Sequence, residues 1–248
     1  MPTWLIIALR VVLASIVVAF PIAIGYPNNW FISLPAYARF LISGGGMGAV
    51  VILNYWIERE RLTELRQQRD RFKEELATER KKFAAYYIRG ELRSLVEDLN
   101  LPGMHRAYIY LKNPENGKLK VYYEHGMEGM PDHELEFAPD HGWAWETWNV
   151  REHVWCDLQK LSRSKVIQKW RFTSGQFRVI SSTGVKSVLL TPITMPNNPD
   201  ISIAVLGVDS NRNMSETRFN TKIVQDAVYK RAFLIGHMMI GSGLIDNG

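Results

Sequence analysis

A basic segment in the second half of the chain holds the side chains best suited to bind a charged ligand. Positions 158–199 carry seven basic residues and no acidic one, whereas positions 113–157 carry ten acidic residues and three basic ones. Arginine binds phosphate and carboxylate groups through paired hydrogen bonds of defined geometry. The segment therefore favours an anionic small molecule such as a nucleotide, with Arg171, Arg178 and Lys186 as contacts.

Aromatic and hydroxyl side chains lie in and beside the same segment. Indole rings stack on planar ligands, and hydroxyl groups donate hydrogen bonds to anions. These residues complete the predicted ligand site: Trp143, Trp145, Trp148, Trp170, Ser181, Ser182 and Thr183. The alternative interpretation is a solvated basic surface that pairs with the acidic half of the chain or lies near anionic lipid, with the tryptophan residues in the core.

Other residue patterns do not point to a metal site or a cofactor. His125, His133 and His141 lie near two aspartates, but their spacing matches no recurrent metal-ligand motif. We expect these residues to be polar surface groups, and we predict neither a bound metal nor a cofactor.

Cys156 is the only cysteine in the chain. A single cysteine excludes an intramolecular disulfide and a multi-cysteine metal site, and we expect it to be a small core residue. No nucleophile–base motif, phosphate-binding loop or kinase, cyclase or phosphodiesterase signature is present, so we expect no enzymatic activity. The net charge of +5 is spread without a long block of like charge, which argues against binding to nucleic acid.

The residues that could bind a ligand are preceded by a highly charged connector. From Glu58 to Lys82, 16 of 25 residues are charged, and none is glycine or proline, which favours a helix. Apolar residues at heptad spacing favour pairing of this helix with a second copy of itself. They are Leu62, Leu65, Phe72, Leu76, Phe83 and Tyr86, with Arg69 and Glu79 at the two remaining core positions. A single solvated helix held by neighbouring ion pairs is the alternative.

Two apolar segments precede the connector, at Trp4–Gly25 and Phe40–Ile57. Each is long enough to cross a bilayer, which needs about 20 residues, and a short turn joins them, which predicts a two-helix membrane hairpin. Arginines follow the second segment, so we expect both termini in the cytoplasm and a two-pass protein of the inner membrane. A cleaved signal peptide is the alternative for the first segment.

The remaining chain predicts an α+β domain. A helix leads up to position 99, followed by a strand pair at 106–111 and 119–124 and a short strand at 134–137. A second strand pair covers 187–193 and 201–209, and a last helix begins with Ser215 as its cap. The order predicts an antiparallel sheet flanked by helices.

Two runs in this domain resemble the GAF family. Positions 184–193 read Gly-Val-Lys-Ser-Val-Leu-Leu-Thr-Pro-Ile, similar to the central strand of GAF domains, and 203–210 resemble the next strand. The segments at 142–148 and 154–157 resemble the small helix and short strand that come before them. The resemblance implies a small-molecule sensor with a pocket between the sheet and the middle segment, and pairing through the terminal helices.

These features predict a membrane hairpin at 1–57, a coiled-coil connector at 58–83, a GAF-like domain at 84–243 and a tail at 244–248. We expect a homo-oligomer in contact with membrane lipid, whose cytoplasmic domain relays ligand binding through the coiled coil to the hairpin. Such a protein would be a ligand-gated membrane effector in bacterial signalling or antiviral defence. The alternatives are an adaptor that docks a separate signalling enzyme and a scaffold with a ligand-free domain.

Overall fold

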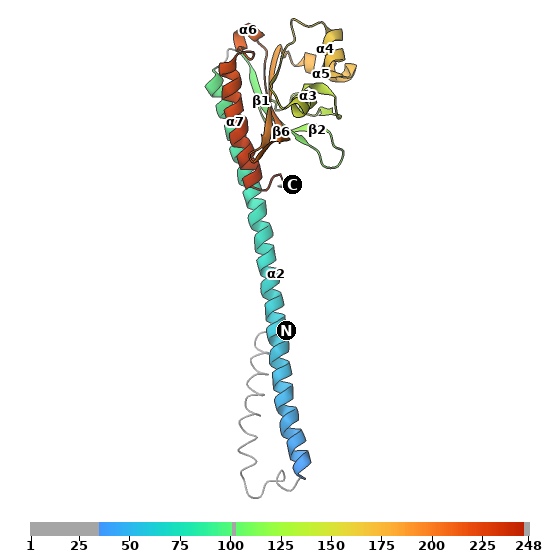
Figure 1. The fold of residues 1–248 in the computed structure, drawn as a ribbon, viewed down its shortest axis with the longest axis vertical. Helices are drawn as coiled ribbons and strands as arrows, with labels where there is room; N and C mark the ends of the chain where they lie inside the picture. The colour runs from blue at the N-terminus through green and yellow to red at the C-terminus, as the bar shows by residue number, and fades with distance from the viewer. Residues whose placement is uncertain (1–34, 101–102, 246–248) are drawn as a thin grey trace. The chain divides into compact units, whose positions relative to one another are not determined.

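The computed structural model describes residues 35–100 and 103–245. The chain divides into two compact units, Met1–Glu74 and Glu75–Gly248. Helix α2 (Ala36–Leu99) contributes residues to both units (Figure 1). The predicted first membrane span at 4–25 and the turn after it lie outside the described residues.

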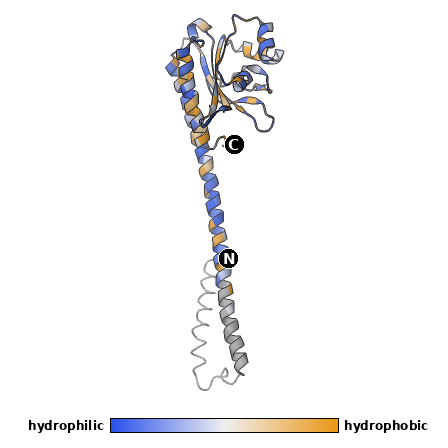
Figure 2. Cartoon of the chain, viewed as in Figure 1, coloured by the Kyte–Doolittle hydropathy of each residue, from blue (hydrophilic) through white to orange (hydrophobic). Residues whose placement is uncertain are grey.

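Helix α2 confirms the helix predicted for the connector. Residues 58–82 contain no glycine or proline to interrupt it, and Figure 2 shows this part coloured mainly as hydrophilic. The heptad residues Leu62, Leu65 and Phe72 are 54%, 51% and 65% exposed. Their pairing with a second copy of the chain stays a prediction.

No helix within residues 35–100 and 103–245 combines the length and the hydropathy that crossing a membrane needs. The predicted second span at 40–57 lies inside α2, which continues without a break into the charged residues from Glu58 onward. The two-helix membrane hairpin is therefore not confirmed. It stays a prediction, as does the cytoplasmic placement of the two termini.

The unit Glu75–Gly248 is built on a six-stranded antiparallel sheet with the strand order β3-β2-β1-β6-β5-β4. The strands are β1 (His105–Lys112), β2 (Leu119–His125), β3 (Glu136–Phe137), β4 (Val154–Asp157), β5 (Ser187–Met195) and β6 (Asn198–Ser210). Both predicted strand pairs are confirmed, as β1–β2 and β5–β6. The third strand is shorter than predicted, because the Leu135 amide donates to the Asp132 carbonyl in a turn.

Helices cover both faces of this sheet. The middle of the chain forms α3 (Gly142–Val150), α4 (Arg163–Trp170) and α5 (Ser174–Ser182), and its end forms α6 (Met214–Thr217) and α7 (Lys222–Gly241). The predicted cap of the last helix at Ser215 is wrong, because the last helix α7 begins at Lys222 with Thr221 as its N-cap residue, and Ser215 lies inside α6. Asn213 caps the short helix α6. Its side-chain oxygen accepts a hydrogen bond from the backbone N–H of Glu216, and the Glu216 carboxylate accepts one from the backbone N–H of Asn213.

Alternation along the strands divides the core into two clusters, one on each face of the sheet. Tyr108 and Tyr110 of β1 pack with α3, α4 and α5. Ala107 and Ile109 of the same strand pack with α7 and with the end of α2, where Leu92 is fully buried. The predicted α+β class is confirmed, and Figure 1 shows α7 beside the end of α2.

Candidate functional site

The face of the sheet beneath α3, α4 and α5 is the face on which a ligand pocket was predicted. Aromatic rings occupy it. The Tyr108 and Tyr110 rings lie 5.3 Å apart and edge to face, and Phe137 stands 5.7 Å from Tyr110 in the same manner. The ring centroids of Phe172 and Trp143 lie 4.9 Å apart. Because all five residues are buried, these rings form a packed layer between the sheet and the middle helices.

A glycine in the sheet makes room for one of these rings. Gly207 of β6 pairs directly with Tyr108 of β1. A Cβ atom at Gly207 would lie 2.2 Å from Cε2 of Tyr108, well inside contact distance. The tyrosine ring therefore lies over the glycine and covers the centre of this face.

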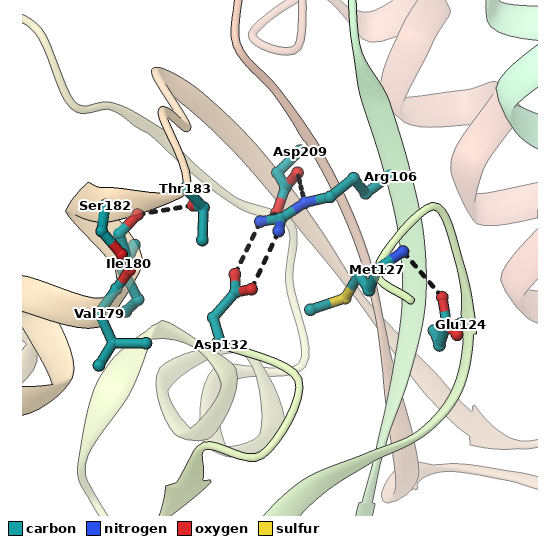
Figure 3. A network of polar contacts seen from close by, with 9 residues as sticks. All are labelled: Arg106, Glu124, Met127, Asp132, Val179, Ile180, Ser182, Thr183 and Asp209. Carbon is teal, nitrogen blue, oxygen red and sulfur yellow. Dashed lines mark hydrogen bonds and ion pairs between the residues drawn. The ribbon is translucent and has the colours of Figure 1, made fainter. Parts of the chain in front are cut away.

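A buried network of charges lies at the end of the same strands (Figure 3). The guanidinium group of Arg106 on β1 donates to Asp209 on β6 through Nε at 2.7 Å and Nη2 at 2.6 Å. It also donates to Asp132, in the segment between β2 and β3, at 3.0 Å and 2.8 Å. Arg106 is 1% exposed, so one buried cation joins the sheet to this segment through two carboxylates.

Burial changes the acidity of the groups in this network. It raises the pKa of Asp209, while the hydrogen bonds and charge of Arg106 act in the opposite direction. Burial lowers the pKa of Arg106, but hydrogen bonds and the charge of Asp209 outweigh it, and the guanidinium pKa is raised overall. Burial and the Asp209 charge also raise the pKa of Tyr108. The arginine is thus charged and the tyrosine neutral at neutral pH. The network ties the sheet to the segment between β2 and β3.

The predicted tryptophan residues belong to the core. Trp143, Trp145 and Trp170 are 3%, 6% and 2% exposed, and Trp148 packs against the same cluster. The Trp145 indole donates to the Phe137 carbonyl at 2.8 Å. The Trp170 indole donates to the carboxylate of Glu146 on α3. Their rings are packed against other residues and do not form an open stacking surface.

The predicted polar contacts lie mostly on the surface. Arg171, Arg178, Lys186, Ser181 and Ser182 are exposed, and Thr183 is half-buried. The three hydroxyl groups at 181–183 donate to carbonyl groups in their own helix. The structure therefore separates the tryptophan rings from the basic groups, and the ten predicted residues do not converge on one pocket.

The basic side chains are nevertheless exposed to solvent and form few ion pairs. All seven are exposed: Lys160, Arg163, Lys165, Lys169, Arg171, Arg178 and Lys186. Within the part of the chain that the structure describes, Lys160 alone among them forms a salt bridge, with Asp157 at 3.7 Å. We call these seven residues the basic surface.

Two kinds of side chain could still carry chemistry: the thiol of Cys156, and His, Cys, Asp and Glu side chains that could bind a metal. Cys156 is buried, and burial raises the pKa of its thiol to about 12, so it is not a thiolate at neutral pH. Across residues 35–100 and 103–245, no three His, Cys, Asp or Glu side chains are grouped as metal ligands. The predicted core role of Cys156 is confirmed.

Comparison with known proteins identifies the fold. No protein-family profile and no curated protein matches the chain. The GAF domain region of a Geobacter sulfurreducens PCA protein superposes with a TM-score of 0.51 and 15% identity, covering 65% of this chain and 96% of that one. The fold is GAF-like.

Two further solved structures have TM-scores below 0.5 and add no weight to this assignment. A type II free methionine-R-sulfoxide reductase from Thermoplasma acidophilum gives 0.47 at 16% identity, covering 64% of this chain and 93% of that one. The GAF domain of an Acinetobacter phosphoenolpyruvate-protein phosphotransferase gives 0.46 at 9% identity, covering 67% and 96%. At such identities the comparisons show the fold alone.

The charge network of this GAF-like domain was not predicted from the sequence. One signal was available, because Arg106 and Asp209 stand at the ends of otherwise apolar strand segments. A charged residue on a buried strand needs a partner of opposite charge. The partner could not be identified, because several acidic residues lie in the intervening sequence.

Proposed function

We propose that this chain is a membrane-anchored sensor, whose GAF-like domain receives a small-molecule signal and passes it to helix α2. The observation that carries the proposal is the packing of the end of α2 into the core of the domain. Ile88, Leu92 and Leu95 are at most 2% exposed and belong to the same core cluster as the sheet and α7. A ligand that shifts the sheet therefore changes the packing of this helix.

Helix α2 is suited to transmit such a change along the chain. It runs from Ala36 to Leu99, and residues 58–82 contain no glycine or proline. Hydrogen bonds join each turn of a continuous helix to the next, so a change at its buried end acts directly on the neighbouring turns. The apolar segments at 4–25 and 40–57 support membrane attachment at its other end, and the arginines after position 58 support a cytoplasmic domain.

We propose an anionic ligand, such as a nucleotide, that binds at the basic surface. Arg171 and Arg178 support this choice because they are exposed and form no salt bridge among the described residues. A guanidinium without a carboxylate partner is available for paired hydrogen bonds to a phosphate. The ligand would contact the outer side of α4 and α5, and the tryptophan residues would support these helices from within.

The test is a thermal-shift screen of the full chain in detergent with mono-, di- and cyclic nucleotides. At least one nucleotide should raise the melting temperature of the wild-type protein, and Arg178→Ala should reduce this shift. Arg93→Ala is the matched control, since Arg93 is also an exposed helical arginine without a salt bridge among the described residues. If no nucleotide stabilises the protein, or if Arg171→Ala and Arg178→Ala leave a hit unchanged, the basic surface is not a nucleotide site.

A further inference from the structure

A cavity lies on the other face of the sheet, between its edge strand β4 and helix α7. Its volume is about 360 Å³, and its lining includes His153, Trp155, Gln225 and Tyr229. Side chains alternate along β4, so Val154 and Cys156 enter the aromatic core while Trp155 lines this cavity. The cavity is therefore separate from the basic surface and from the Arg106 network.

Aromatic side chains from two different elements form its walls. Trp155 on β4 is 46% exposed, and Tyr229 on α7 is 47% exposed. The Tyr229 ring meets the His153 ring edge to face at 6.0 Å and 78°. Exposed rings at the mouth of a cavity offer stacking surfaces to a planar ligand.

The polar groups of the cavity include both donors and acceptors. His153 Nδ1 is hydrogen-bonded to the Thr191 hydroxyl at 2.9 Å, which fixes the imidazole and leaves Nε2 for another partner. The Gln225 side-chain amide donates to the Phe219 carbonyl at 3.1 Å, which leaves its oxygen as an acceptor. Such a set matches the edge of a nitrogen heterocycle, which alternates donors and acceptors.

The charges around the cavity do not select for an ion. The Arg151 guanidinium donates to the Asp200 carbonyl at 2.5 Å. Arg151 and Glu152 are the two charged residues of the lining. Asp226 on α7 also acts on His153, yet burial is the larger effect and lowers the pKa of this imidazole. The imidazole is thus neutral at neutral pH, and the lining carries one charge of each sign.

We propose that this cavity binds a planar nitrogen heterocycle of nucleoside size, with its ring against Trp155 and Tyr229 and its edge hydrogen-bonded to His153 and Gln225. The volume of about 360 Å³ lies within the range of small-molecule sites. This site is additional to the anion proposed at the basic surface and does not depend on it.

In the signalling role proposed above, on which this step rests, occupation of the cavity would act on helices α7 and α2. Gln225 and Tyr229 stand on α7, whose buried residues Val228 and Ala232 share a core with Leu92 of α2. A ligand held between β4 and α7 restrains α7 against the sheet, so it favours one packing of α2 over others.

Equilibrium dialysis of the full chain in detergent with adenosine, guanosine, cytidine and uridine tests the site. Nucleosides carry no phosphate, so the basic surface contributes nothing to their binding, and failure here is distinct from failure of the anion proposal. At least one nucleoside should bind with a dissociation constant below about 1 mM. Tyr229→Ala and Trp155→Ala should each weaken it about tenfold or more through loss of stacking.

Tyr122→Ala is the matched control, because Tyr122 is 43% exposed on β2 and lies outside the cavity lining. It should leave the affinity unchanged, and circular dichroism should confirm that every variant is folded. Arg178→Ala should also leave nucleoside binding unchanged. The proposal is overturned if no nucleoside binds the folded wild-type protein, or if either cavity variant binds as tightly as the wild type.

Discussion

Arg106 joins segments of the domain that lie far apart in the chain. Its partners Asp132 and Asp209 are 26 and 103 positions away, and all three residues are at most 8% exposed. Charges taken out of water are tolerated only when partners of opposite charge and hydrogen bonds compensate for the lost hydration. The arrangement makes Arg106 the residue on which the order of the segment between β2 and β3 depends.

Replacing this arginine should therefore destabilise the domain strongly. Arg106→Leu leaves the Asp209 carboxylate buried without its cation, which typically costs about 3–5 kcal/mol. Urea denaturation of the full chain in detergent would measure the loss. The matched control is Lys118→Ala, which removes a 3.1 Å surface pair with Glu136 and should cost at most about 1 kcal/mol.

A double variant separates the charge effect from packing. Arg106→Leu combined with Asp209→Leu removes the buried cation and one of its two carboxylate partners, and it should be more stable than Arg106→Leu alone. If the double variant is less stable than the single one, uncompensated charge is not what makes Arg106→Leu unstable.

At the scale of elements, the sheet is packed differently on its two faces. One face carries the rings of Tyr108 and Tyr110 against the middle helices, and the other carries mainly aliphatic side chains against α2 and α7. The close approach of Tyr108 to Gly207 shows how tightly the first face is filled. Protein interiors are packed at the density of organic crystals, so an added methyl group at such a contact would overlap with neighbouring atoms and force them to move.

Gly207→Ala should destabilise the sheet, because its new Cβ would stand 2.2 Å from the Tyr108 ring. Overpacking of this kind typically costs about 1–3 kcal/mol. Gly90→Ala is the matched control, since Gly90 lies in α2 and a methyl group added there would meet nothing within 4 Å. That control should stabilise the helix by about 0.5–1 kcal/mol. Equal effects of the two substitutions on the melting temperature would contradict the contact at Gly207.

At the scale of the whole molecule, apolar side chains remain uncovered on the helices. Phe83, Tyr86 and Tyr87 of α2 are 62%, 75% and 58% exposed, and Phe233 and Leu234 of α7 are 51% and 44% exposed. A single exposed apolar residue is ordinary, whereas a helix that repeats them at heptad spacing is typical of a paired helix. The homo-oligomer stays a prediction, which rests on the apolar residues of α2 at heptad spacing: Leu62, Leu65, Phe72, Leu76, Phe83 and Tyr86.

The prediction is that changing Leu65, Phe72 and Leu76 to aspartate together dissociates the oligomer, because these positions would place charges in the paired seam. Sedimentation of the full chain in detergent would measure the change in assembly state. Gln67→Asp with Lys81→Asp is the control, since these outward heptad positions add negative charge without entering the seam. A wild-type protein that is monomeric at tens of micromolar, about the range of a weak coiled coil, would refute the pairing.

The sequence by itself determined the elements whose signals are local. An uninterrupted run of charged and apolar residues after Glu58 determined the helix, and apolar strand segments around turn residues determined the pairs β1–β2 and β5–β6. Each of these patterns acts over a few residues, because helix and hairpin hydrogen bonds connect near neighbours in the chain.

The tertiary structure alone decided which side chains meet. The tryptophan residues and the basic residues are mixed in sequence from Trp143 to Lys186, yet packing turned the first group largely inward and left the second in water. Charged groups such as Lys and Arg lose hydration when buried, while indole rings gain stability from it, so the folded chain sorts neighbours into different environments. Arg106 contacts Asp209 because strand pairing places β1 beside β6, and it contacts Asp132 because the segment between β2 and β3 folds back to the same end of the sheet. No local pattern in the sequence determines either contact.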